Sequence, residues 1–170
     1  HTLISEDWEI YKRIEELLSV SIPEIEELIA PLDDEDPANT FIAIKQKDFK
    51  KYFNYQQISD GTLNIIGYLL IIFSPRRVGL IGIEEPEDYI HPSLLNFLRD
   101  VLKSTNTQLI TITHSPYFVD ALKLNDIIIV NKIKGNTVLE RLSNREELEK
   151  FLDTLTLGDI IYSNELEDIK

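Results

Sequence analysis

Two successive glutamates follow a short aliphatic run, and their position suits them to chemistry. Glu84 and Glu85 come directly after the apolar residues 78–83 and precede Pro86 and Glu87. If residues 78–83 form a strand of a parallel sheet, both carboxylates lie at its carboxyl edge, where open α/β folds bind ligands. One carboxylate can then hold Mg²⁺ through water, while the other orients or deprotonates an attacking water. The alternative is a solvated acidic loop that follows a strand.

A histidine follows the next predicted strand. Residues 109–113 form a second aliphatic run, and His114 comes directly after it. The intervening residues 92–103 carry apolar side chains at helical spacing, so strand, helix and strand together indicate a parallel crossover. We therefore expect His114 at the same sheet edge as Glu85, where an imidazole can donate to a phosphate oxygen. The alternative is an ordinary loop histidine.

A third segment with chemical potential precedes the most apolar helix. Residues 62–73 are almost uniformly apolar and are closed by Ser74-Pro75, which predicts a buried helix. The preceding Ser59, Asp60 and Gly61 place unpaired backbone N–H groups at the beginning of that helix, and such an end attracts phosphate. The alternative is plain N-capping by Ser59 or Asp60.

These segments need a scaffold, and the rest of the chain predicts one of mixed α/β class. Residues 6–29 indicate two acidic helices that meet near Pro23. Strands are further predicted over residues 40–45 and 126–131, with a turn that leads into residues 137–142. Short helices are predicted over residues 117–122 and 145–153.

Composition excludes several classes of protein. The chain has 170 residues, 17 Lys+Arg against 30 Asp+Glu and a net charge of −13, which argues against a general nucleic-acid or anionic-membrane binder. It has no cysteine, so disulfide scaffolds and cysteine zinc sites are excluded, and a cytoplasmic location fits. The apolar residues 65–73 are too short to span a membrane. Because the chain begins His1-Thr2 and contains no methionine, we expect it to be part of a longer protein.

The three segments occur in one order along the chain. A Ser-Asp-Gly-Thr loop opens an apolar helix, a Glu-Glu-Pro-Glu segment follows, and Thr-Ile-Thr-His-Ser-Pro comes last. This arrangement resembles the C-terminal half of the ABC-type ATPases of the RecF, SMC and overcoming-lysogenization-defect (OLD) group. It is most similar to the AAA ATPases of prokaryotic defence operons, over roughly residues 40 to 165.

The resemblance implies a role for each segment. Glu84 falls on the Walker B position that supports Mg²⁺ through water, and Glu85 on the general base that activates water. Residues 88–91 fall on the D-loop that contacts a second subunit, and His114 on the switch histidine. The signature loop, which caps the γ-phosphate of a nucleotide held by the opposite subunit, is formed by Ser59, Asp60, Gly61 and Thr62.

The same resemblance implies the fold and the function. We expect a partial P-loop NTPase lobe with a mostly parallel sheet and flanking helices in residues 38–170, preceded by an acidic helical segment in residues 1–37. In the complete protein, two ATP-bound heads with Mg²⁺ would close as a homodimer, and hydrolysis of the ATP would be converted into opening and closing of the dimer, in DNA repair or defence. DNA or an effector protein would be a further partner.

Two motif positions depart from the usual pattern, and one part is missing. Asp60 replaces the first glycine of the Leu-Ser-Gly-Gly-Gln consensus, and Glu84 replaces an aspartate. The Walker A loop G-x-x-x-x-G-K-[ST], which holds the β- and γ-phosphates, does not occur, since none of the six glycines is followed by Lys-Ser or Lys-Thr. We therefore expect a Walker A lobe elsewhere and an inactive 170-residue chain on its own.

Two other classes of function stay open at this point. A metal-dependent phosphoesterase or nuclease would use the carboxylates and the imidazole as ligands. A non-catalytic lobe would bind a partner protein through its acidic N-terminal helices. The ligands of the metal-dependent alternative would be Glu84, Glu85, Glu87 and His114.

Overall fold

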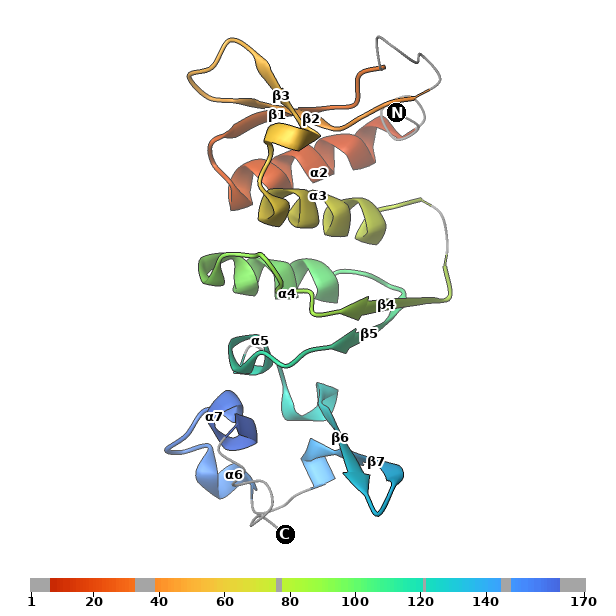
Figure 1. Cartoon of the computed structure of the whole chain (residues 1–170), viewed down its shortest axis with the longest axis vertical. Helices are drawn as coiled ribbons and strands as arrows, with labels where there is room; N and C mark the ends of the chain where they lie inside the picture. The colour runs from red at the N-terminus through yellow and green to blue at the C-terminus, as the bar shows by residue number, and fades with distance from the viewer. Residues whose placement is uncertain (1–6, 33–38, 76–77, 121, 145–147, 163–170) are drawn as a thin grey trace. The chain divides into compact units, whose positions relative to one another are not determined.

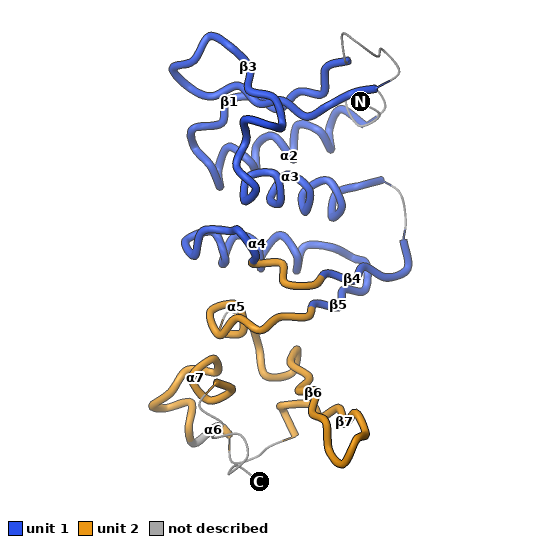
Figure 2. The backbone as a smooth tube through the Cα atoms, in the orientation of Figure 1, with its two compact units in different colours: residues 1–83, 88–111 blue, residues 84–87, 112–170 orange. Residues whose placement is uncertain are grey.

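The computed structural model describes residues 7–32, 39–75, 78–120, 122–144 and 148–162. The chain divides into two compact units, shown in different colours in Figure 2. Unit 1 consists of residues 1–83 and 88–111, and unit 2 of residues 84–87 and 112–170. Among the described residues, no helix has both the length and the apolar character needed to cross a bilayer.

Unit 1 begins with a helix that packs on a three-stranded antiparallel sheet (Figure 1). Helix α2 (Trp8–Ser21) contacts strand β1 (Ile25–Ile29), which pairs with β2 (Ala43–Gln46), which in turn pairs with β3 (Tyr52–Asn54). The hydroxyl of Tyr11 in α2 donates to the carbonyl oxygen of Leu28 in β1, and burial is the largest cause of the raised pKa of Tyr11.

The prediction of a second acidic helix after Pro23 is wrong, because residues 25–29 form β1. Their sequence, Ile-Glu-Glu-Leu-Ile, has good helix formers, yet Ile25 and Leu28 are buried and the backbone pairs with β2. The pairing is irregular between Ile25 and Glu27, and this bulge brings both buried side chains to the covered face. Long-range pairing has overridden local helix propensity.

The predicted apolar helix is confirmed as α3 (Asp60–Ile72), and the predicted helix over residues 92–103 as a 3₁₀ turn followed by α4 (Leu95–Lys103). In unit 1, α3 contacts both α2 and α4, so it lies between them (Figure 1). Ile65, Ile66 and Leu69 are consequently almost fully buried.

Strands β4 (Leu80–Glu84) and β5 (Gln108–Ile112) are hydrogen-bonded neighbours joined through α4, as the crossover predicted. The backbone N–H of Glu85 donates to the carbonyl oxygen of Ile112 at 2.7 Å, so the two strands end side by side and run parallel. The α/β class is confirmed. The expected single, mostly parallel sheet is not what the described residues form. Only the β4–β5 pair among them is parallel, and the sheets β1–β2–β3 and β6–β7 are antiparallel.

Unit 2 combines a hairpin with three short helices. Strands β6 (Ile128–Ile133) and β7 (Asn136–Arg141) pair around Lys134 and Gly135, whose φ angles of 49° and 84° form the tight turn that forces antiparallel pairing. Its helices are α5 (Pro116–Asp120), α6 (Leu148–Phe151) and α7 (Leu157–Tyr162). The beginning of the helix predicted over residues 145–153 lies outside the described residues. The core consists of Val119, Ile127, Leu142, Leu148, Leu157 and Ile160.

Short 3₁₀ turns complete the description. They are η1 (Tyr55–Gln57), η2 (Pro92–Leu94), η3 (Leu124–Asp126) and η4 (Leu142–Asn144).

Candidate functional site

Glu85 occupies a sharp turn immediately after β4. Its φ of 43° is in the left-handed region, which a side chain with a Cβ adopts at a cost. The hydrogen bond from its N–H to Ile112 holds this backbone in place beside the end of β5. Strained backbone of this kind is common where a functional side chain must be aimed.

The structure brings Glu85 and His114 together in unit 2, as the sequence predicted. The backbone N–H of His114 donates to Oε2 of Glu85 at 3.1 Å, and Nε2 of the imidazole lies 3.7 Å from Oε1. The carboxylate is therefore oriented by a backbone donor and forms an ion pair whenever the imidazole is protonated. The Glu85 side chain is 25% exposed and that of His114 is 88% exposed, so the carboxylate is sheltered while the imidazole is accessible.

Glu87 forms a second, more buried carboxyl group next to Glu85. The hydroxyl of Thr113 donates to Oε1 of Glu87, and the N–H of Ser115 donates to Oγ1 of Thr113 at 2.9 Å. Desolvation raises the pKa of Glu87, the bond from Thr113 opposes the rise, and the neighbouring Glu85 adds to it. Oε2 of Glu87 is buried without a hydrogen-bond partner among the described residues.

The raised pKa means that the folded chain favours the neutral form of Glu87 more than the unfolded chain does. Protonation of Glu87 would give its buried Oε2 a hydrogen to donate. From the sequence, Glu87 was named only as a metal ligand. The hydrogen bond from Thr113 could not be predicted, because that bond forms only where the ends of β4 and β5 meet.

The carboxylates do not form the ligand cluster that a metal-dependent phosphoesterase would need. Within the described residues, which include Glu84, Glu85, Glu87 and His114, no three acidic or histidine side chains are close enough to hold a metal ion. Glu84 is exposed at the end of β4. A single carboxylate of this kind fits Mg²⁺ that keeps most of its ligands from water and phosphate oxygens, because Mg²⁺ dehydrates reluctantly.

A second group of predicted residues lies in unit 1, at the beginning of α3. Ser59 caps this helix, since its Oγ accepts from the N–H of Thr62 at 3.2 Å and lies 2.9 Å from Oγ1 of Thr62. The capping interpretation is thus confirmed. Asp60 and Gly61 form the first turn, and their backbone N–H groups stand at the positive end of a 13-residue helix.

The predicted D-loop packs directly on this helix. A Cβ placed on Gly61 would lie 2.3 Å from the carbonyl oxygen of Tyr89, and Nδ2 of Asn64 donates to the carbonyl oxygen of Asp88 at 3.1 Å. Tyr89 has a φ of 63° and a 77% exposed side chain. Glycine at position 61 therefore permits the contact between two segments that the sequence analysis had treated separately.

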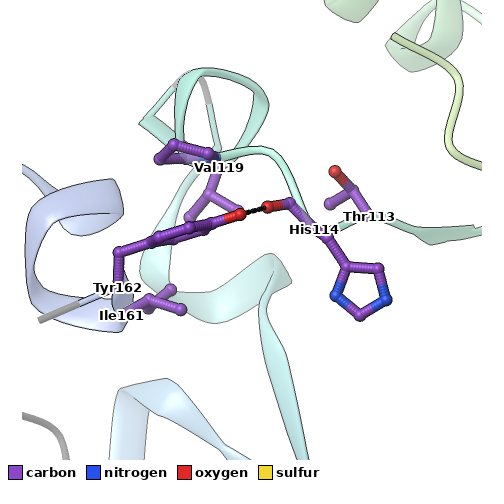
Figure 3. A pocket seen from close by; sticks show the side chains of 6 residues that line it. Thr113, His114, Val119, Ile161 and Tyr162 are labelled. Atoms are coloured by element: carbon purple, nitrogen blue, oxygen red, sulfur yellow. Dashed lines mark hydrogen bonds between the residues drawn. The ribbon is translucent and has the colours of Figure 1, made fainter. Parts of the chain in front are cut away.

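The C-terminal helix of unit 2 contacts the His114 segment, which sequence reasoning had not found. The hydroxyl of Tyr162 in α7 donates to the carbonyl oxygen of His114 (Figure 3). Figure 3 also shows that the imidazole of His114 points away from the Tyr162 ring. A cavity of about 280 Å³ is lined by Thr113, His114, Pro116, Val119, Ile161 and Tyr162.

Comparison with known families identifies the family of the chain. A family model described as "AAA domain, putative AbiEii toxin, Type IV TA system" matches residues 1–120 of the 170. The chain belongs to this AAA-domain family. The recognition of an AAA/ABC-type ATPase family from the motifs is thereby confirmed, while the OLD-like detail stays a prediction.

Solved structures show that this AAA-domain chain has the fold of an SMC ATPase head. A structure from work on "ATP-driven dimerization and DNA stimulated activation of SMC ATPases" is similar with a TM-score of 0.57 and 17% identity, over 86% of this chain and 92% of that one. An SMC head bound to the C-winged helix domain of ScpA gives 0.59 and 18%, over 83% of this chain and 44% of that one.

A third solved structure is also similar to this chain. The SMC head domain from Thermotoga maritima gives a TM-score of 0.52 and 15% identity, over 82% of this AAA-domain chain and 49% of that chain. The chain therefore spans somewhat less than half of two of these three heads. The search of curated proteins gave no match.

Proposed function

We propose that this chain is the C-terminal part, from signature loop to C-terminus, of an ATP-hydrolysing ABC-type head of the OLD/RecF-like kind. The observation that carries the proposal is the position of Glu85. Its carboxylate is aimed by the peptide of His114 at the point where two parallel strands end. That point is the usual ligand edge of an open α/β sheet.

Each residue of this edge has a chemical task in the proposal. Glu85 accepts a proton from the water that attacks the γ-phosphorus, and the bond from phosphorus to the β,γ-bridging oxygen breaks, which releases ADP and phosphate. The exposed imidazole of His114 donates to a γ-phosphate oxygen. Glu84 would hold Mg²⁺ through water, and the ion supplies positive charge that offsets the charge of the phosphates.

The beginning of α3 completes a second site in this proposal. Ser59, Asp60, Gly61 and Thr62 would face a nucleotide bound by the other subunit of a homodimer. The positive end of α3 and its N–H groups are the chemistry that such a γ-phosphate requires. The contact of Gly61 with Tyr89 would let the D-loop move together with the signature loop.

The phosphate-binding Walker A lobe must come from another segment, N-terminal in the same protein or in a separate chain. The exposure of the β4–β5 sheet supports this part of the proposal. Leu80 in β4 is 52% exposed and Ile110 in β5 is 50% exposed, while Ile81, the next residue of β4, is buried. Parallel strands are ordinarily covered on both faces, and a two-stranded sheet alone is marginal. Further strands from a Walker A lobe would cover this face.

We further propose that residues 1–37 act as an acidic N-terminal segment and residues 38–170 as the ATPase lobe. The biological process would be DNA repair or defence, with DNA or an effector protein as partner. The net charge of −13 gives no support to DNA binding by this chain, so we assign any DNA-binding surface of the head to the missing Walker A lobe. DNA-dependent stimulation of hydrolysis that disappears at high salt would test that step.

ATP-dependent dimerisation of the completed head tests the signature-loop role. Glu85→Gln removes the base and should accumulate an ATP-bound dimer, detected by light scattering. Adding Ser59→Asp should abolish the dimer, because a negative charge then faces the γ-phosphate. Ser59→Asn is the matched control, because Asp and Asn cap a helix about equally well and differ in charge. Equal dimerisation of the Asp and Asn variants would contradict the proposed function.

A further inference from the structure

We propose that Tyr162 is a positioning residue for hydrolysis, through which the C-terminal helix α7 holds the carboxylate of Glu85. This inference rests on the proposed function, because it gives the role of base to Glu85. It assigns a task to a helix that the resemblance covers but to which the sequence analysis gave no role in the chemistry.

The argument begins with the peptide groups of His114, which are engaged on both sides of the residue. The N–H of His114 donates to Oε2 of Glu85 at 3.1 Å, and its carbonyl oxygen accepts from the hydroxyl of Tyr162. A shift of this carbonyl rotates the short segment that carries the N–H. Tyr162 is therefore two hydrogen bonds away from the carboxylate of Glu85 and acts through backbone alone.

The position of α7 is fixed independently of Tyr162. The N–H of Gly158 donates to Oδ1 of Asp120 at 2.6 Å. A Cβ on Gly158 would lie 2.7 Å from the carbonyl oxygen and 2.8 Å from Cβ of Pro116, so α7 approaches α5 as closely as only glycine permits. Leu157 and Ile160 are buried in the core of unit 2. The helix that carries the Tyr162 hydroxyl is thus held in place by contacts that do not involve Tyr162.

The cavity beside His114 explains why one hydroxyl matters there. Besides Tyr162, the space is lined by the aliphatic side chains of Val119 and Ile161, with Thr113 and Pro116 at the strand end. These side chains offer the carbonyl oxygen of His114 no alternative N–H donor. The imidazole points the other way (Figure 3), so Tyr162 fixes the main chain without blocking the side chain that would meet phosphate.

The test compares Tyr162→Phe, which removes only the hydroxyl, with Tyr117→Phe as the matched control. Tyr117 lies on α5 of the same unit and is 70% exposed. In ¹⁵N NMR of the 170-residue chain, Tyr162→Phe should speed exchange of the His114 amide proton with water by about fivefold, the equivalent of one hydrogen bond. It should also move the Glu85 carboxyl ¹³C signal. Tyr117→Phe should change neither, and equal spectra for both variants would overturn the inference.

An activity measurement separates this inference from the proposed function. In the head completed by a Walker A lobe, Tyr162→Phe should lower kcat for ATP hydrolysis by about fivefold or more with KM unchanged. An unchanged kcat, with Glu85→Gln inactive, would overturn the inference and leave the ATPase proposal standing. Full activity of Glu85→Gln would instead remove the proposed role of Glu85 as the base, while the NMR comparison would still decide whether Tyr162 holds the Glu85 carboxylate.

Discussion

Gly61 and Tyr89 are in backbone contact, although 28 positions separate them, because a Cβ on Gly61 would stand 2.3 Å from the carbonyl oxygen of Tyr89. Asn64, one turn further along α3, donates to the carbonyl oxygen of Asp88 at 3.1 Å. The helix that carries the signature loop and the loop that would contact a second subunit are therefore joined within unit 1.

Replacement of this glycine should separate the two segments. Gly61→Ala places a methyl group 2.3 Å from the backbone carbonyl oxygen of Tyr89, so the backbone must shift, and the expected loss of stability is about 1–3 kcal/mol. Gly67→Ala in the same helix is the control, since its Cβ would meet open space, and it should stabilise by about 0.5–1 kcal/mol. Chemical denaturation of both variants measures the difference. A Gly61→Ala variant as stable as Gly67→Ala would show that the contact with Tyr89 is not tight in solution.

Glu87 should make stability depend on pH. Burial is the largest cause of its raised pKa, so the folded state holds the proton more tightly than the unfolded state. The resulting stabilisation is complete below the ordinary value of 4.5 and is lost as pH rises through the folded pKa. Glu87→Gln stays neutral and keeps an acceptor for Thr113, so at pH 7 it should be the more stable protein by less than about 1 kcal/mol.

Thermal melts at a series of pH values check this prediction. The advantage of Glu87→Gln should shrink as the pH is lowered and disappear below 4.5. Thr113→Val should raise the pKa of Glu87 further, because the bond from Thr113 lowers it. Parallel melting curves for the original chain and Glu87→Gln across the whole range would show that Glu87 is not desolvated.

The close approach of α7 to α5 should tolerate no added methyl group. Gly158→Ala would push Cβ into the carbonyl and the ring of Pro116, and should destabilise unit 2 by about 1–3 kcal/mol. Asp120→Ala removes the acceptor of the Gly158 N–H and should cost about 1–3 kcal/mol. Hydrogen exchange over residues 148–162 measures both effects. Unchanged protection there in both variants would contradict the described packing.

Calorimetry should find no tight binding of Mg²⁺ATP to the 170-residue chain alone. The Walker A loop supplies most of the contacts to the β- and γ-phosphates, and the sequence does not contain one. Saturable heat in the low micromolar range would mean that another loop of this chain cradles phosphate.

Local sequence was enough to predict the helices and strands that carry the site. The apolar run before Phe73 became α3, and Glu85 and His114 meet because parallel strands end at one edge. These features follow from periodicity and from the rule for strand–helix–strand crossovers. Such features depend on residues that are close to one another in the sequence.

Features that depend on distant partners were missed. Ile25 to Ile29 has helix-forming glutamates, but pairing with β2 makes it a strand. Tyr162 lies in a segment that the resemblance covers, but its contact with the carbonyl oxygen of His114 is visible only in the folded chain. Local propensity does not indicate which distant segments will meet. Contacts of this kind can therefore be identified only from the folded structure.

The central claim is that Glu85 is the general base for ATP hydrolysis. The most direct test is a single-turnover measurement of ATP hydrolysis by the head completed with its Walker A lobe, with and without Glu85→Gln. The account predicts hydrolysis by the unsubstituted head and a loss of at least about 100-fold in the variant, with ATP still bound, because a general base contributes roughly 10²–10⁴-fold. Hydrolysis at the same rate in both proteins would contradict the assignment of Glu85 as the base.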